Sequence, residues 1–399
     1  MSAPTATRTW LGLAAFYAAL FAVLGVFMQY FPLWLHDERG LDEAQIAVVL
    51  SSMTVARTVA GPLWAQQVDR TGQPRRVLLL LCALSLAAFL IYHFADSVFG
   101  LMTASFVFGC CYPPMHPITD AFASATARRE GFAYGRLRMV GSVTFLAMVL
   151  GVGYWLEHSS SSALFGLLLV GLVLLLATAV GLPNGPPPPP RVTDKAPMLE
   201  LLRSKPFLLL MLAAAIVQGS HAPYYNLSTL HWQAHGIAKS TAGVLWAEGV
   251  LAEIVLFWFA RGSTDRLRPT TLLALGGGAA VVRWTVLGLT TEVGWLFASN
   301  WLHALTFTCT YLGSLRALDR RVHPSQRATA QGLLGAATSG VGMVAGSLLG
   351  GFLYDRFAGG AFFAMALWGL IGIMLALRLR RLADSNQMDV DASTESRPA

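Results

Sequence analysis

The sequence predicts an all-α membrane protein with twelve transmembrane helices in two halves of six. Of its 399 residues, 55% are hydrophobic and only 12% are charged, whereas about 25% are charged in a soluble domain. Twelve apolar segments each approach the roughly 20 residues that a helix needs to cross a bilayer. A long polar link follows the sixth segment, and six spans on either side of such a link indicate duplicated halves.

The predicted spans are joined mostly by short loops. They are residues 10–35, 44–66, 77–94, 99–120, 134–156, 161–182, 207–230, 240–261, 270–290, 294–317, 328–354 and 359–379. We therefore expect an N-terminal half (1–182), a proline-rich cytoplasmic link (183–206), a C-terminal half (207–381) and a disordered polar tail (382–399). Five consecutive prolines, Pro186 to Pro190, favour an extended, semi-rigid tether in the link.

Basic residues indicate the orientation. Most of the 28 Lys and Arg residues fall in loops on one side of the predicted topology. The loops on the opposite side contain only three of them, Arg39, Lys239 and Arg356. Basic short loops stay cytoplasmic, so both termini are expected in the cytoplasm. The net charge of +7 follows from this topology and needs no nucleic-acid partner. All four cysteines fall within spans, and no metal-ligand spacing occurs, so we expect no disulfide, metal or cofactor.

Ionisable residues lie inside the apolar spans of the second half. They are Glu248, Glu253, Arg283 and His303. A lone charge at that depth costs at least ~2.5 kcal/mol, so such groups face one another or a wet cavity and mark an ion or substrate path. The two acids are about 140° apart around their helix. We expect them not to share a face, with Glu253 as the main coupling acid and Glu248 as a second candidate.

The first half offers weaker candidates. Arg57 lies deep in the second span, where a cavity-facing guanidinium could grip a carboxylate through two parallel hydrogen bonds. Gln29 and Tyr30 are polar handles near the outer end of the first span, although an aromatic residue there can be an interfacial anchor. Asp120 and Arg138 fit a substrate site and solvated span ends equally well. The three prolines of CCYPPMHPITDAF predict an interruption of the fourth span.

The seventh span carries a polar face. Gln218, His221 and Tyr225 recur at helical spacing beside Tyr224, and Pro223 breaks the hydrogen-bond ladder next to them. A single buried histidine is more often a hydrogen-bonded core group, but these neighbours favour a wet lining.

The eleventh span carries a stripe of small residues. Gly342, Gly346 and Gly350 recur every four residues, and Gly335 and Ser339 extend the stripe. Small residues at that spacing allow close helix contact. No strand precedes the glycines, so a nucleotide-binding interpretation is not favoured.

The loops after the second and eighth spans share an Asp-Arg pair. The motif residues are Asp69, Arg70, Gly72, Asp265 and Arg266. The Asp-Arg-x-Gly loop and the six-plus-six layout resemble the major facilitator superfamily over essentially the whole chain to Arg381, with Ala65 where the family motif begins with Gly. The resemblance implies the major facilitator fold and a monomer.

Two segments resemble the lactose permease group. PITDAF, followed eighteen residues on by GRLRMVGS, is similar to that group's sugar-binding segment. This implies a substrate-binding role for Asp120, Arg138 and Ser142. Phe145 stands where the permease has a stacking Trp, which argues against a galactoside.

The second half resembles the proton-coupling region of the same group. Glu253, Arg283 and His303 match its acid, arginine and histidine, and Thr306 stands where it has a second glutamate. The resemblance therefore implies proton coupling through a changed site.

The strings QGSHAPYY, AEIVLF, VVRW and LHALTFT more specifically resemble the bacterial 3-phenylpropionate transporter branch. This implies an aromatic carboxylate as substrate and a bacterial inner membrane. The anion anchors would be Arg57, Arg138 and Arg283, and the ring contacts Phe145, Tyr224 and Tyr225.

The sequence thus predicts proton-coupled uptake of a small organic solute by alternating access, with the substrate, protons and the lipid bilayer as partners. A sugar or nucleoside symporter is the alternative within transport, and drug efflux is less favoured. A membrane sensor stays open. An intramembrane enzyme is disfavoured, because no HExxH, GxSxG or glycine-rich phosphate loop occurs.

Overall fold

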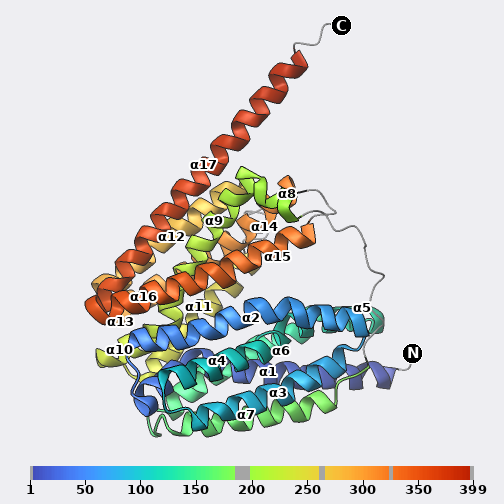
Figure 1. The fold of residues 1–399 in the computed structure, drawn as a ribbon, viewed down its shortest axis with the longest axis vertical. Coiled ribbons are helices and arrows are strands. Elements are labelled where there is room, and N and C mark those ends of the chain that lie inside the picture. Colours follow the sequence, from blue (N-terminus) through green and yellow to red (C-terminus); the bar gives the residue numbers. More distant parts are fainter. Residues whose placement is uncertain (1–2, 185–197, 260–265, 323–326, 396–399) are drawn as a thin grey trace. The chain divides into compact units, whose positions relative to one another are not determined.

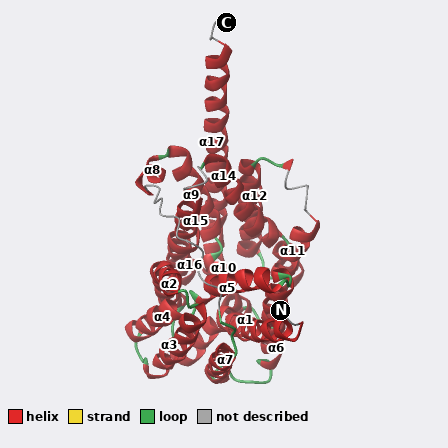
Figure 2. Ribbon diagram, turned by 90° about the vertical axis from the view of Figure 1, so that its right-hand side faces the viewer, coloured by secondary structure: helices red, strands yellow, loops and turns green. Residues whose placement is uncertain are grey.

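The structure is a computed structural model in which residues 3–184, 198–259, 266–322 and 327–395 are described. Within these ranges the structure consists of helices joined by loops and contains no strand (Figure 2). The prolines Pro186 to Pro190, predicted to form an extended tether, and the motif residue Asp265 lie outside the described residues.

The described residues of the first half form seven helices. They are α1 (Ala3–Arg39), α2 (Glu43–Thr71), α3 (Pro74–Phe94), α4 (Val98–Cys111), α5 (Met115–Glu130), α6 (Tyr134–Trp155) and α7 (Ala163–Val180) (Figure 1). The interruption predicted in the fourth span is confirmed, because α4 ends and α5 begins around Pro113 and Pro114. Local signals set other boundaries: Asp42 and Gln45 form a capping box at the start of α2.

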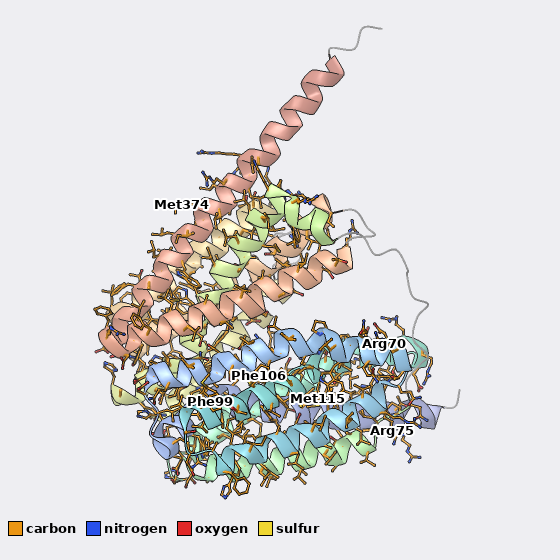
Figure 3. The ribbon with its side chains drawn as sticks, viewed as in Figure 1. Arg70, Arg75, Phe99, Phe106, Met115 and Met374 are labelled. Atoms are coloured by element: carbon orange, nitrogen blue, oxygen red, sulfur yellow. The ribbon has the colours of Figure 1, made fainter. Side chains whose placement is uncertain are left out.

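The loop motif closes α2. Asp69 and Arg70 lie in its last turn, and Gly72 caps it with a left-handed φ of 64°, which glycine adopts without steric cost. Figure 3 shows Arg70, at the end of α2, on the same side of the first unit as Arg75, at the start of α3. In the second half, Arg266 comes just before α12.

The second half is more often interrupted. Its elements are α8 (Met198–Arg203), α9 (Lys205–Gly219), α10 (Ala222–Ala234), α11 (Lys239–Phe259), α12 (Pro269–Leu289), α13 (Val293–Asn300), the π-helix η2 (Ala304–Cys309), α14 (Thr310–Arg321), α15 (Arg327–Gly335), the π-helix η4 (Ala336–Gly342), α16 (Met343–Phe357), the short η5 (Ala358–Gly360) and α17 (Ala361–Glu395). The predicted break beside Pro223 is confirmed, because α9 and α10 flank Ser220 and His221.

Each predicted span coincides with a helix or with a run of consecutive helices, which confirms the fold class. Nine helical stretches of the described residues are long and apolar enough to cross a membrane. One of them, Thr329–Leu382, contains two predicted spans. The other two predicted spans are α11, which carries two glutamates, and the stretch from α13 to α14, which η2 interrupts.

Two segments are helical where the sequence led us to expect no helix. A short helix, α8, forms in the link that was expected to be extended. The helix α17 continues to Glu395, where the sequence led us to expect disorder after Arg381. No Gly or Pro occurs between Leu382 and Glu395, so nothing in that stretch stops the helix.

The helices group into two compact units. The first contains Met1–Arg191, Pro223–Ala247 and Ser347–Arg356, and the second contains Val192–Ala222, Glu248–Gly346 and Phe357–Ala399. The units cut across the sequence halves because α10 and part of α16 pack in the first unit. There, Gln29 donates to Thr229 at 2.7 Å and Asn226 donates to Ser347 at 2.6 Å. The proposed division between residues 182 and 207 stays a prediction.

Large apolar side chains cover the outer faces of the helices. Phe99 is 78% exposed on α4 and Met374 is 57% exposed on α17 (Figure 3). Such residues would face water in a soluble protein but suit the hydrocarbon of a bilayer. With the apolar spans, they are typical of an integral membrane protein.

The predicted small-residue stripe lies against α9 within the second unit. A Cβ added at Gly342 would clash with the carbonyl of Ala215, and one at Gly346 would clash with the carbonyl of Gly219. The backbones touch directly there, as small residues allow. By contrast, a Cβ at Gly335 would meet nothing within 4 Å.

We expect Gly346→Ala to destabilise the protein by about 1–3 kcal/mol, the usual penalty for overpacking. The matched control Gly335→Ala should be neutral or slightly stabilising, because it reduces unfolded-state entropy without a clash. Thermal unfolding of the purified protein, followed by size-exclusion chromatography, measures both. Equal melting temperatures for the two variants would contradict the close packing.

The start of α11 has a cap from a distant part of the chain. Glu157, just beyond α6 in the first unit, accepts a hydrogen bond from the backbone N–H of Ser240 at 2.7 Å. This bond, formed at the positive end of a helix, lowers the pKa of Glu157 from its ordinary value.

A carboxyl with a lowered pKa stabilises the fold above its unfolded-state pKa and loses that effect as the pH falls through the folded-state value. Glu157→Gln should therefore lower the melting temperature by about 1 °C near neutral pH. The difference from the wild type should begin to shrink below the unfolded-state pKa of about 4.3 and should vanish below the lower folded-state pKa. Melting curves across pH test this, with the exposed Glu292→Gln as the control; a pH-independent difference would refute the cap.

Candidate functional site

Three helices of the first unit direct polar and aromatic side chains toward one acid. On each helix the residues are four apart, so they share a face. The set, hereafter the Asp120 cluster, comprises Tyr17 and Phe21 of α1, His116 and Asp120 of α5, and Tyr134, Arg138 and Ser142 of α6.

Tyrosine hydroxyls hold the acid at the centre of this cluster. Asp120 Oδ1 accepts hydrogen bonds from Tyr17 at 2.7 Å and from Tyr134 at 2.9 Å. The Nε of Arg138 lies 3.7 Å from the same oxygen. The ion pair is therefore long, while the short contacts come from neutral donors. The side chains of Arg138 and Asp120 are 36% and 42% exposed, so a solute can reach both.

The guanidinium of Arg138 keeps donor capacity. It lies 4.4 Å from the ring centroid of Phe21, and its Nη1 makes a 3.3 Å hydrogen bond to Ser142. A guanidinium has five N–H donors, and the contacts of Arg138 with Ser142 and Asp120 engage only some of them. The group is therefore able to bind a further anion next to an aromatic ring.

A histidine and a second arginine complete the surroundings. The ring of His116 meets Phe21 edge-on at 5.2 Å, and within the described residues its buried Nε2 has no hydrogen-bond partner. Arg57 of α2 and Arg138 both act electrostatically on His116. Arg57, predicted to face a cavity, thus lies near the Asp120 cluster.

The other predicted residues of the first unit have different partners. Gln29 donates to Thr229, and Tyr30 donates to the carbonyl of Val149 at 2.6 Å. Tyr224 and Tyr225 pack against Trp246, with ring centroids 5.0 and 5.6 Å away. Phe145, only 8% exposed, packs in α6 near Gly25.

The second unit contains a fully buried arginine. Arg283 of α12 is 0% exposed. Its Nη1 donates to His303 Nδ1 at 2.9 Å, its Nη2 donates to Asn300 at 3.0 Å, and its guanidinium lies 4.7 Å from the Trp284 ring. A buried charge persists only when it is paired and hydrogen-bonded, and these contacts supply part of that.

His303 links the arginine to an acid. Its Nε2 lies 2.8 Å from Glu253 Oε1. A guanidinium cannot accept a hydrogen bond, so Nδ1 must be the acceptor toward Arg283. The proton of the neutral imidazole is then on Nε2 and points to Glu253. The predicted association of Glu253, Arg283 and His303 is therefore present in the structure.

Glu248 belongs to the same group of residues. It is hydrogen-bonded by the indole of Trp301, and both Glu248 and Glu253 are acted on by the charge of Arg283. Between the two acids, Gly249 lets α11 approach His303, since a Cβ there would lie 3.3 Å from the imidazole. The two acids thus serve one guanidinium although they are about 140° apart on α11. The Arg283 cluster denotes Glu248, Glu253, Arg283, Asn300, Trp301 and His303.

Gln218 and His221 of the predicted polar face adjoin the Arg283 cluster. Tyr225 does not share their face, because the helix is interrupted between α9 and α10 and Tyr225 packs against Trp246. His221 Nε2 lies 2.8 Å from the hydroxyl of Thr306, and the His221 ring is 5.5 Å from that of His303. Gln218 donates to the carbonyl of Phe307 at 3.3 Å. His221 is fully buried, and its Nδ1 also lies 3.1 Å from the Val217 carbonyl. It is therefore a hydrogen-bonded core group, and the wet lining expected from the sequence is wrong at this residue.

Sequence inspection missed several contributors to both clusters. Tyr17 and Tyr134 could have been found from their four-residue spacing to Phe21 and Arg138, which places each pair on one helix face. Asn300 and Trp301 gave no such signal, because they act on residues of other helices.

Comparison with known proteins gives consistent matches over nearly the whole chain. Residues 10–365 match the MFS_1 like family. A probable 3-phenylpropionic acid transporter of Escherichia coli (strain K12) is 29% identical over 370 residues, covering 92% of this chain and 96% of that protein. A maltose permease of Geobacillus stearothermophilus is 25% identical over 376 residues, covering 92% and 93%.

The fold also matches solved structures. The crystal structure of the nucleoside transporter NupG superposes with a TM-score of 0.81 at 14% identity, covering 93% of this chain and 98% of that one. At that identity the match supports the fold alone.

Proposed function

The chain belongs to the MFS_1 like family of secondary transporters, and from this premise we propose that it takes up a small aromatic carboxylate together with protons by alternating access. It is an integral membrane transporter and not an enzyme. The asymmetry of its basic loops supports cytoplasmic termini, and its bacterial relatives support a bacterial inner membrane.

The accessible guanidinium of Arg138 over the Phe21 ring is the observation that carries the substrate class. A carboxylate can take two parallel hydrogen bonds from a guanidinium, and an aromatic solute can pack beside the ring. Arg57 adds a second positive charge to the surroundings. The related E. coli protein, named for 3-phenylpropionic acid, is consistent with this class.

We expect Arg138→Lys to weaken 3-phenylpropionate binding by about tenfold or more, because a lysine cannot form the bidentate pair. Isothermal titration or a thermal-shift assay on the purified protein measures the loss. The control Arg136→Gln, at an exposed position of α6, should bind as the wild type does. The neutral alcohol 3-phenylpropanol should bind weakly to every form. Equal binding of the acid and the alcohol would contradict carboxylate recognition.

A sugar is the second candidate, and one observation favours it. All the contacts to Asp120 described above reach Oδ1, so Oδ2 can accept hydrogen bonds from sugar hydroxyls. The maltose permease match is consistent with this class. A thermal-shift panel of 3-phenylpropionate, maltose and a nucleoside separates the candidates, since stabilisation by maltose alone would replace the aromatic acid as substrate.

The Arg283 cluster supports proton coupling. Burial favours the neutral form of a carboxyl, whereas a nearby cation favours the charged form. Glu253 experiences both effects, through its apolar span and through Arg283 beyond His303. Such an acid can alternate between proton-bound and ion-paired forms during transport.

Glu253→Gln should abolish accumulation of substrate driven by a proton gradient, because glutamine cannot bind and release the proton. Exchange of labelled for unlabelled substrate across the membrane should persist. Both are measured in proteoliposomes, with Glu292→Gln in the loop before α13 as the control. A Glu253→Gln protein that still concentrates substrate against its gradient would exclude this residue as the coupling acid.

A further inference from the structure

The Arg283 cluster has two acids for one base. Glu253 reaches Arg283 through His303, and Glu248 interacts with the same guanidinium while it accepts a hydrogen bond from Trp301. Both acids lie on α11 within apolar surroundings. The number of protons on this cluster is therefore set by charge balance.

His303 does not contribute a charge. Arg283 occupies the lone pair of Nδ1, and Nε2–H donates to Glu253. A second proton on the imidazole would have to displace the guanidinium from Nδ1 and would place two cations side by side. The imidazole of His303 is consequently a neutral bridge. The neighbouring His221, whose ring lies 5.5 Å from that of His303, is fully buried beside the Arg283 cation and adds no charge either, so the titrating groups are the two carboxyls.

With both acids ionised the cluster would carry a net charge of −1 inside the membrane, which low-dielectric surroundings disfavour. One bound proton makes it neutral. Each acid accepts one hydrogen bond, Glu253 from His303 and Glu248 from Trp301. They differ at the remaining oxygen, because among the described residues Glu248 Oε2 is buried without a hydrogen-bond partner, which is true of neither oxygen of Glu253. An ionised carboxylate needs donors at both oxygens more than a protonated one does.

We propose that Glu248 and Glu253 share a single proton around Arg283, and that this proton resides on Glu248 while Glu253 is ionised. This inference rests on the proposed proton coupling and deepens it. The proton binds to a carboxylate oxygen of Glu248 and leaves to water, and His303 keeps the same single proton throughout. Glu248 thereby supplies the second acid that is missing at Thr306.

Infrared difference spectroscopy of the full-length protein tests the sharing directly, because a protonated carboxyl has a carbonyl band that a carboxylate lacks. At neutral pH the wild type should show this band, and Glu248→Gln should lose it. Glu253→Gln should lose it as well, because Glu248 then ionises against Arg283. If one acid instead held its proton independently of the other, the band would be lost in only one of the two variants.

Three further variants control for misfolding and for the bridge. Glu248→Asp keeps a carboxyl and should keep the band, as should the exposed Glu292→Gln. His303→Gln can still accept from Arg283 and donate to Glu253, and it should also keep the band. Loss of the band in His303→Gln with a normal melting temperature, or its persistence in Glu248→Gln, would overturn the proposal.

Transport gives a separate readout. Glu248→Gln should lose proton-driven accumulation of 3-phenylpropionate in proteoliposomes but retain exchange. Wild-type accumulation in Glu248→Gln would overturn the role of this acid. If the wild type itself fails to accumulate substrate under a proton gradient, the proposed coupling fails, and the infrared bands still decide whether the proton is shared.

Discussion

The burial of the Arg283 guanidinium is the constraint around which the second unit is arranged. A fully buried cation is tolerated only where neighbouring elements supply acceptors and counter-charges. Asn300 and His303, on either side of the end of α13, accept its N–H groups, and Trp284 lies against its face. The acids of α11 complete the charge balance, which ties three predicted spans to one side chain.

The Asp120 cluster solves the same problem in another way. Its acid and arginine are partly exposed, so water shares the cost of solvating them, and tyrosines rather than an ideal salt bridge hold the carboxylate. A loosely paired arginine can exchange its partners for a substrate. A fully buried one, such as Arg283, is better suited to respond to a proton, since each added charge changes its surroundings.

The sequence predicted those features that depend on local chemistry. The breaks at Pro113 and Pro223, the cap at Gly72 and the close packing at Gly346 follow from residues that fix or free the backbone nearby. The pairing of Glu253 with His303 was also predictable, because isolated charges in apolar spans must meet. Asn300, Trp301 and Tyr17 were not, since their roles depend on helix rotations that no local pattern encodes. One such change in helix rotation occurs at the π-helix η2, directly after His303.

The relation between Glu248 and Glu253 shows where helical-wheel reasoning fails. Two residues about 140° apart point away from each other on one helix. Glu248 and Glu253 nevertheless both interact with Arg283, because the guanidinium and the His303 imidazole together extend along the side of α11. Gly249, which lies between the two acids, has no side chain to keep the imidazole away. For the proposed coupling, the number of acids around the buried cation therefore matters more than their positions along the chain. On that basis a threonine at residue 306 is compatible with the proposed coupling, because α11 carries a second acid, Glu248, beside Arg283.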